Sequence, residues 1–407
     1  MGVAAPAAAA TLFADPAGSG SGTCEPPDPP CTLQRAVEVE AGDGDEVIVN
    51  PGTYNEGSNE VTILDAINLH GAAGASPVIV SNSALEAVEG TLPGIRVANL
   101  VIEYSGGGTG VRLTNGASGE RLYVKSGGTV GCTMFQGTLN DSVCWSGGAS
   151  GNGIFSSVSA STSITTTLRN VTAVASGTSS RGMDFTSAGG LTHVVDAKNV
   201  IADGVEFDIR AQAGASSTTA INLAHSNYVT TDAGGAGTAT TTPAGSGTNQ
   251  TAAPLFANAA NGDFHEAAGS PTIDAGTGDS QLGSADIDGE ARSQGAVPDI
   301  GADEFVPTLP PAANGDRFPP DTKILKGPKK RTKKRKAKFQ FGGSEPGLTF
   351  ECSLDEKAFK PCHSPKKFRS LKRTKHVFAV RAVDAAGNRD PTPADRKWSI
   401  KKKKRRK

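Results

Sequence analysis

The fold is decided by six short segments: Asn99-Leu-Val-Ile102, Arg121-Leu-Tyr-Val124, Asp141-Ser-Val-Cys144, Asn170-Val-Thr-Ala173, Asn199-Val-Ile-Ala202 and His225-Ser-Asn-Tyr228. Their first residues follow one another at intervals of 22, 20, 29, 29 and 26 residues. Self-similarity at a period of roughly 20–50 residues is the signature of a solenoid, in which each repeat stacks on the previous one. The segments are short and β-branched and lie between Gly-, Ser- and Thr-rich turns, so each repeat is expected to be a coil of strands.

Four Gly-led segments form a second set: Gly110-Val-Arg-Leu113, Gly153-Ile-Phe-Ser156, Gly182-Met-Asp-Phe185 and Gly204-Val-Glu-Phe207. The first three begin 11 or 12 residues after a segment of the first set, which predicts two strands in each coil. The inward side chains should form apolar columns along the solenoid. The residues expected there are Val101, Val111, Ile154, Val171, Met183 and Val200. The Leu-x-x-Leu-x-Leu frame of a leucine-rich repeat is missing.

Asn99, Asn170 and Asn199 open three of the segments and invite a functional interpretation. Asparagine tolerates the left-handed backbone of a tight corner, and stacked Asn side chains stabilise stacked strands. We therefore favour a structural role for this column.

The N-terminal end of a solenoid needs a cap over its strand edges. Cys31–Val39 is predicted to be a short amphipathic helix with Thr32 as its N-cap, directly before a first strand at Glu46–Tyr54. Its apolar face contains Leu33, Ala36 and Val37. Residues 1–11 are Ala-rich and are interpreted as a signal-peptide remnant or a disordered tail.

The six cysteines fall in three close pairs: Cys24 with Cys31, Cys132 with Cys144, and Cys352 with Cys362. None forms a CxxC or Cys/His zinc pattern. We favour local disulfides in an oxidising compartment over six reduced thiols, which predicts a secreted or cell-surface protein. No run of about 18 apolar residues exists, so no transmembrane segment is expected.

Charge divides the chain in two. Residues 1–315 contain 10 Lys and Arg against 32 Asp and Glu, a net charge of −22, whereas residues 316–407 contain 30 against 9, a net charge of +21. This asymmetry predicts two domains with different surface roles. The Pro-rich, aperiodic stretch 307–319 is expected to be the linker between them.

Several motifs resemble those of bacterial extracellular right-handed parallel β-helix proteins, which have a pectate-lyase-like solenoid. They are Cys31–Ala36 with Pro51–Tyr54 and, later, Pro254–Phe256, Asn261–Phe264, Gly269–Gly276, Asp286–Gly289, Arg292 and Asp299–Phe305. The later motifs resemble the closing segment of the "choice-of-anchor Q" group. The resemblance implies an all-β domain over residues 12–306, and it implies a shared scaffold more than a shared reaction.

The acids of this closing segment are Asp286, Asp288, Asp299, Asp303 and Glu304. Calcium takes several oxygen ligands, so a Ca²⁺ site is one interpretation. We favour the other, in which these acids cap turns and close the C-terminal end of the solenoid.

Residues 320–400 resemble a bacterial immunoglobulin-like repeat, a small β-sandwich, on the motifs Ser344–Asp355, Phe378–Asn388 and Trp398–Ile400. Apolar residues alternate independently of that resemblance, as in Phe339/Phe341, Phe350/Cys352/Leu354, Phe378/Val380/Ala382 and Trp398/Ile400. We expect Trp398 in the core and not as a sugar platform.

The departure from that family is the basic run Lys329–Lys336 and the polybasic tail 401–407. No base-stacking aromatics are interleaved, so nucleic acid is disfavoured as a partner. Attachment to cell-envelope or extracellular polyanions and polysaccharides is favoured, with a solvated tail lacking a specific partner as the other interpretation.

Parallel β-helices often carry polysaccharide lyases and hydrolases, so outward carboxylates are candidate catalytic residues. The residue after the inward one in the Gly-led set gives the column Arg112, Phe155, Asp184 and Glu206. Asp184 and Glu206 on neighbouring coils would suit a calcium site or a nucleophile/acid pair. The sequence thus predicts a monomeric, surface-associated protein for adhesion or polysaccharide contact, with a lyase or glycoside hydrolase as the alternative.

Overall fold

The computed structural model describes residues 9–159, 162–306, 320, 322–343, 348–355, 357–383, 388–390 and 393–401. The chain divides into two compact units, Met1–Leu309 and Pro310–Lys407. The division falls within the expected linker 307–319, which, like residues 1–8 and 402–407, lies outside the described residues. Among the described residues, no helix is long and apolar enough to cross a membrane.

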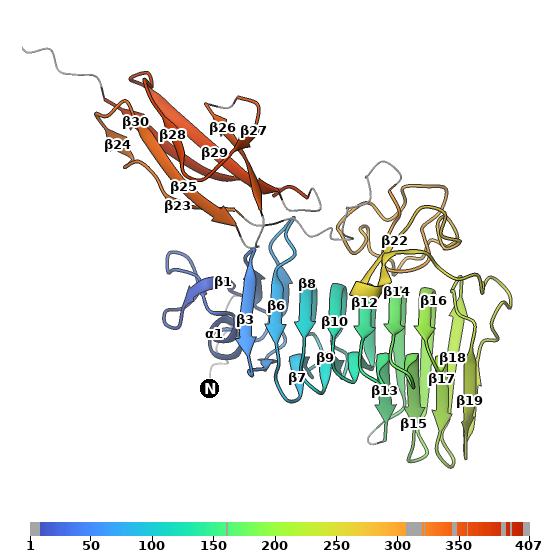
Figure 1. Cartoon of the computed structure of the whole chain (residues 1–407). Helices are drawn as coiled ribbons and strands as arrows, with labels where there is room; N and C mark the ends of the chain where they lie inside the picture. The colour runs from blue at the N-terminus through green and yellow to red at the C-terminus, as the bar shows by residue number, and fades with distance from the viewer. Residues whose placement is uncertain are drawn as a thin grey trace, which may run out of the picture. The chain divides into compact units, whose positions relative to one another are not determined.

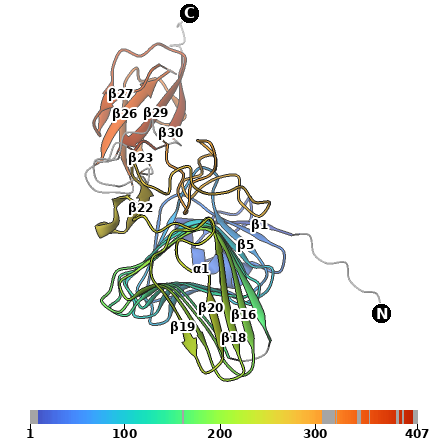
Figure 2. The ribbon, with the colours of Figure 1, turned by 90° about the vertical axis from the view of Figure 1, so that its right-hand side faces the viewer.

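The first unit is a β-solenoid of about seven turns, built from two parallel sheets (Figures 1 and 2). The twelve-stranded sheet contains β1 (Thr11–Ser19), β2 (Glu46–Val49), β3 (Thr53–Gly57), β5 (Asn68–Gly71), β6 (Val78–Ser81), β8 (Arg96–Tyr104), β10 (Ser118–Ser126), β12 (Gly137–Ser146), β14 (Ile164–Ala175), β16 (Thr192–Gly204), β18 (Thr218–Ala224) and β20 (Thr238–Thr241). The eight-stranded sheet contains β4 (Val61–Ile63), β7 (Glu86–Gly90), β9 (Thr109–Thr114), β11 (Val130–Phe135), β13 (Asn152–Val158), β15 (Arg181–Ser187), β17 (Phe207–Ala213) and β19 (Thr231–Gly235).

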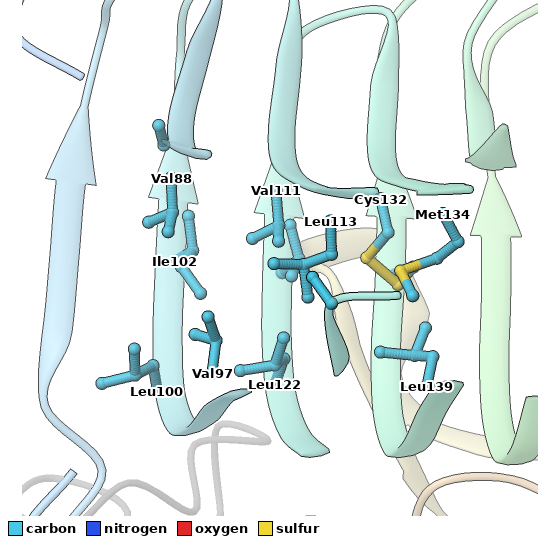
Figure 3. Close-up of a cluster of buried hydrophobic side chains, with 14 of the residues drawn as sticks. Val88, Val97, Leu100, Ile102, Val111, Leu113, Leu122, Cys132, Met134 and Leu139 are labelled. Atoms are coloured by element: carbon cyan, nitrogen blue, oxygen red, sulfur yellow. A yellow bond between two sulfur atoms is a disulfide. The ribbon is translucent and has the colours of Figure 1, made fainter. Parts of the chain in front are cut away.

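Aliphatic columns fill the solenoid, as the sequence predicts (Figure 3). In the eight-stranded sheet Val88 pairs with Val111 and Val111 with Cys132. Across the interior, Cys132 forms a disulfide with Cys144 of β12. Because equivalent residues stack at the strand spacing of about 4.8 Å, each layer repeats the packing of the one before it.

One expected column is wrong at a single position. Val171 pairs with Val200 in the interior, whereas Val101 pairs with Tyr123 and lies outside the interior cluster. Leu100 takes the interior position instead, because Leu100 pairs with Leu122. The Asn99 segment has three consecutive large apolar residues, Leu100 to Ile102, so alternation alone did not fix its phase.

The six polar residues that open the first set of segments all have left-handed backbones: φ is +54° at Asn99, +49° at Arg121, +49° at Asp141, +51° at Asn170, +53° at Asn199 and +47° at His225. They bend the long strands, so that Leu168 and Val171, on either side of Asn170, both face the interior. Asn170 donates to Asp141 Oδ1 and Asn199 donates to Asn170 Oδ1, each over 2.8 Å. The predicted structural ladder is confirmed for Asn170 and Asn199, whereas the Asn99 side-chain oxygen accepts from Arg121 Nε.

The predicted cap is present at the N-terminal end. Helix α1 (Leu33–Arg35) continues into a π-helical turn at Ala36–Glu40, and the Thr32 hydroxyl accepts a hydrogen bond from the Arg35 N–H over 3.3 Å. Leu33, Ala36 and Val37 are buried in the solenoid core. The strand expected at Glu46–Tyr54 divides into β2 and β3, and β1 precedes the helix and pairs in parallel with β2.

The closing segment, residues 254–306, contains β21 (Phe256–Asn258), a 3-10 turn at Ala259–Asn261 and β22 (Asp263–Glu266). It does not lie over the last coil as expected. It runs back along the twelve-stranded sheet, where the Tyr123 hydroxyl donates to the Gly262 carbonyl over 3.0 Å and Arg292 pairs with Asp141 at 2.6 Å. These partners belong to β10 and β12, in the middle of the solenoid.

The second unit contains two sheets. The first contains β23 (Thr322–Lys326), β25 (Ala337–Gly343) and β28 (Lys366–Phe368). The other contains β24 (Arg331–Thr332), β30 (Ala394–Ile400), β29 (Lys375–Val383), β26 (Thr349–Leu354) and β27 (Lys360–Cys362). Phe339 of one sheet stacks on Phe378 of the other with ring centroids 4.0 Å apart, and Trp398 is buried beside them, as predicted.

Candidate functional site

The outward face of the eight-stranded sheet carries a continuous register column, which we call the sheet-face stripe. It contains Glu89, Arg112, Thr133, Phe155, Asp184, Arg210 and Asp232. From Glu89 to Arg210, each member lies between two interior positions of its strand; Arg112, for example, lies between the buried Val111 and Leu113. Because side chains alternate along a strand, the stripe faces outward.

Ion pairs organise both ends of the stripe. Arg112 lies 3.4 Å from Glu86 and 3.3 Å from Glu89. Arg210 holds Asp184 in a two-point contact, with Nε to Oδ1 at 3.0 Å and Nη2 to Oδ2 at 2.7 Å. Such charge-assisted pairs fix the side chains in defined positions.

Between the ion pairs the stripe is uncharged. Phe155 is half-buried and pairs in register with Thr133 on one side and Asp184 on the other. Phe135, which pairs with Thr114, is a second half-buried aromatic residue on the same sheet. The face therefore presents half-buried aromatic rings flanked by guanidinium and hydroxyl groups, whereas Asp184 is 1% exposed and its carboxylate is bound by Arg210.

The expected carboxylate pair is not formed. Asp184 aligns with Arg210, whereas Glu206 precedes β17 and pairs with Arg181. The fourth Gly-led segment is misplaced, because Gly204 ends β16, Val205 is 62% exposed, and the interior position beside Met183 belongs to Ile209. In this coil Asp208 stands at the position that Gly182 occupies in the coil before it, so the segment that matches Gly182–Phe185 does not begin with glycine. Nothing in the geometry of Asp184 and Glu206 separates an acid from a nucleophile.

A different acid group lies at the N-terminal end of the stripe. Carboxylate oxygens of Glu60, Glu86 and Glu89 lie within 4.8 Å of one another. Burial and the charges of Glu86 and Glu89 raise the pKa of Glu60 to about 7, and Arg112 opposes this shift. Glu60 was missed from the sequence because it lies before the short strand β4, outside the repeat.

Three of the five acids considered for calcium direct both carboxylate oxygens at backbone N–H groups. Asp286 accepts from Asp288, Glu290 and Glu304; Asp299 accepts from Asp274 and Phe305; Glu304 accepts from Gln294 and Asp299. Burial raises the pKa of Asp286 to about 8 and that of Asp299 to about 6. This geometry is the turn-capping role that the sequence favoured.

The cysteine pairs occur as predicted. The structure contains Cys24–Cys31, Cys132–Cys144 and Cys352–Cys362 disulfides, which account for all six cysteines.

The chain matches no protein-family model, and searches of curated proteins and of solved structures return no match either. The functional interpretation therefore rests on the chain's own sequence and geometry.

Proposed function

We propose that this chain is an exported, surface-associated protein that contacts polysaccharide through the sheet-face stripe and attaches electrostatically through its basic second unit. The observation that carries the proposal is the stripe itself, with Phe155 between ion-paired groups on a rigid parallel sheet. The face of an aromatic ring offers apolar contact area to a ligand that has few polar groups on one of its own faces. Fixed charged groups beside them can bond hydroxyls.

The finer fold assignments belong to this proposal. Connections between parallel strands are right-handed in about 98% of cases, which supports a right-handed winding of the solenoid. The two sheets around Phe339 and Phe378 support an immunoglobulin-like sandwich in the second unit. Three local disulfides support export into an oxidising compartment.

The second unit supplies the charge for attachment. Within the described residues, the run around β24 leaves Lys329, Lys330, Arg331, Lys333, Lys334, Arg335 and Lys336 exposed. The partner class proposed is an anionic cell-envelope or extracellular polymer.

Polysaccharide contact is tested on a glycan array with the full chain and Phe155→Ala. We expect binding to a subset of glycans and a loss of about tenfold in the variant, which corresponds to about 1.4 kcal/mol. Val229→Ala, at an exposed apolar site outside the stripe, is the matched control and should bind like the wild type. Absence of glycan binding, or an unchanged Phe155→Ala, would refute the proposal, and cleavage of the bound glycan would favour the enzymatic alternative.

Attachment is tested by retention on envelope preparations. We expect release of the full chain by moderate salt, and weaker retention of Lys333→Glu/Lys334→Glu/Lys336→Glu, because exposed charges are screened within about 10 Å at 0.1 M salt. Salt-insensitive retention would contradict the mechanism. Tight binding to duplex DNA with a steep salt slope would assign the basic run to nucleic acid.

A further inference from the structure

The closing segment brings one histidine and two aspartates together from three separate stretches. Ligand atoms of His265, on β22, and of Asp288 and Asp303 lie within 4.8 Å of one another. His265 Nε2 lies 3.2 Å from Asp288 Oδ1. His265 and Asp303 are each 1% exposed, whereas Asp288 lies at the surface end of the group.

A fourth residue orients the histidine. Asp263 Oδ1 contacts His265 Nδ1, which turns Nε2 toward Asp288. Asp263 is 6% exposed, and its Oδ2 is a buried oxygen without a hydrogen-bond partner among the described residues. Metal-binding histidines almost always have their second ring nitrogen bonded to a carboxylate or carbonyl.

The donor set determines the class of metal. A ring nitrogen with two carboxylates suits borderline transition metals, whereas Ca²⁺ takes six to eight oxygen ligands. Ligand atoms lie about 2.0–2.2 Å from Zn²⁺. The three ligand atoms lie within 4.8 Å of one another and would have to approach by roughly 1 Å to bind such an ion together. Asp288 lies in the Asp286–Gly289 turn, at the edge of the closing segment.

We propose that His265, Asp288 and Asp303 bind one divalent transition metal of the Zn²⁺ type, with Asp263 as the residue that positions the imidazole. The metal would join β22 to the Asp286–Gly289 turn and to Asp303, and so hold three stretches of the closing segment to one another. This site is independent of the sheet-face stripe, which lies on the other sheet.

The direct test is calorimetry of Zn²⁺ and of Ca²⁺ binding to the untagged, chelator-treated full chain. We expect one Zn²⁺ per chain, with Ca²⁺ weaker, and a rise in the melting temperature with Zn²⁺. Thiol binding does not interfere, since all six cysteines are in disulfides.

Three variants and one control sharpen this test. Asp288→Asn, the least buried ligand, and His265→Gln should lose saturable Zn²⁺ binding, and Asp263→Asn should weaken binding about 10–100-fold. His70→Gln is the matched control, because His70 also contacts a carboxylate, Glu46, at 2.9 Å. If His265→Gln does not fold, Asp288→Asn decides the question.

Several results would overturn the proposal: no Zn²⁺ binding to the wild-type chain, unchanged binding in a folded Asp288→Asn, or Ca²⁺ binding tighter than Zn²⁺. Loss of glycan binding leaves the metal site standing, so the two proposals fail separately.

Discussion

The solenoid and the closing segment satisfy the hydrogen-bonding groups of their buried backbones in different ways. In the solenoid, stacked strands satisfy one another, the interior is aliphatic, and the polar Asn170 and Asn199 bond to their neighbours along the column. In the closing segment, few apolar side chains are buried, and carboxylates bind the backbone N–H groups of successive turns. In the solenoid, stacked strands pair most backbone groups with one another, whereas the closing segment uses carboxylates as acceptors for several of the N–H groups in its turns.

The largest effect is expected at the ion pair that joins the two regions. Arg292 pairs with Asp141, which is 0% exposed, and also donates to the Ala302 carbonyl over 2.7 Å. Arg292→Ala leaves a buried carboxylate without its cation and should cost about 3–5 kcal/mol. Hydrogen exchange should show the loss over residues 284–306, and denaturant melts should show its size.

The double variant Asp141→Asn/Arg292→Met is the control for charge, since it removes both members of the pair. It should recover most of the lost stability. Equal losses in both variants would mean that packing of the arginine, and not its charge, holds the closing segment.

A smaller effect is expected from the interior disulfide. Cys132–Cys144 links β11 to β12 across a separation of 12 residues, so Cys132→Ala/Cys144→Ala should cost about 2–4 kcal/mol of unfolding free energy. Cys352→Ala/Cys362→Ala, in the second unit, should leave the solenoid transition unchanged. A solenoid transition that responds equally to both would contradict independent units.

The Asn ladder should contribute less. Asn170→Ala loses bonds to Asp141 and Asn199 and places a β-carbon at φ +51°, at a cost of about 1–3 kcal/mol. Asn170→Gly relieves the backbone alone and should lie between Ala and wild type in denaturant melts. If the Asn170→Gly and Asn170→Ala variants have equal unfolding free energies, the ladder acts through its hydrogen bonds only.

The smallest effect concerns pH. The raised pKa of Glu60, about 7, means that its contribution to stability is fully present below its ordinary pKa and is lost as pH rises through about 7. Glu60→Gln should therefore gain in melting temperature over the wild type between about pH 5 and about pH 8. Glu25→Gln, at an exposed position, is the control. If the difference in melting temperature between Glu60→Gln and the wild type does not widen with pH, the carboxyl cluster is excluded as its cause.

Much of the solenoid could be predicted, because the same strand pattern recurs in successive coils. The columns through Val111, Ile154 and Met183 follow from spacing. The left-handed corners at the Asn residues and the cap at Thr32 follow from residue type and from the amphipathic pattern. Two errors arose in the register. At Val101 the assignment was shifted by one residue, which moves a side chain to the other face. At Glu206 it was shifted by four residues, because Arg210 is the residue that aligns with Asp184.

The candidate sites were predicted less well for a physical reason. Arg210 and Glu60 acquire their neighbours by stacking of coils, and His265 acquires Asp288 and Asp303 because the closing segment folds back on itself. Neither relation has a local signal. Only the turn-capping acids could be interpreted from residue type alone.

The return of the closing segment also constrains the order of folding. Contacts along the Asn ladder span 29 residues, but the Tyr123–Gly262 and Asp141–Arg292 contacts span 139 and 151. Closing so long a loop is entropically costly until the coils that form the docking surface exist. A chain that emerges N-terminus first would thus wind its coils one by one and dock residues 254–306 last, so that a stalled or truncated product would leave the flank of the middle coils bare to solvent and to other chains.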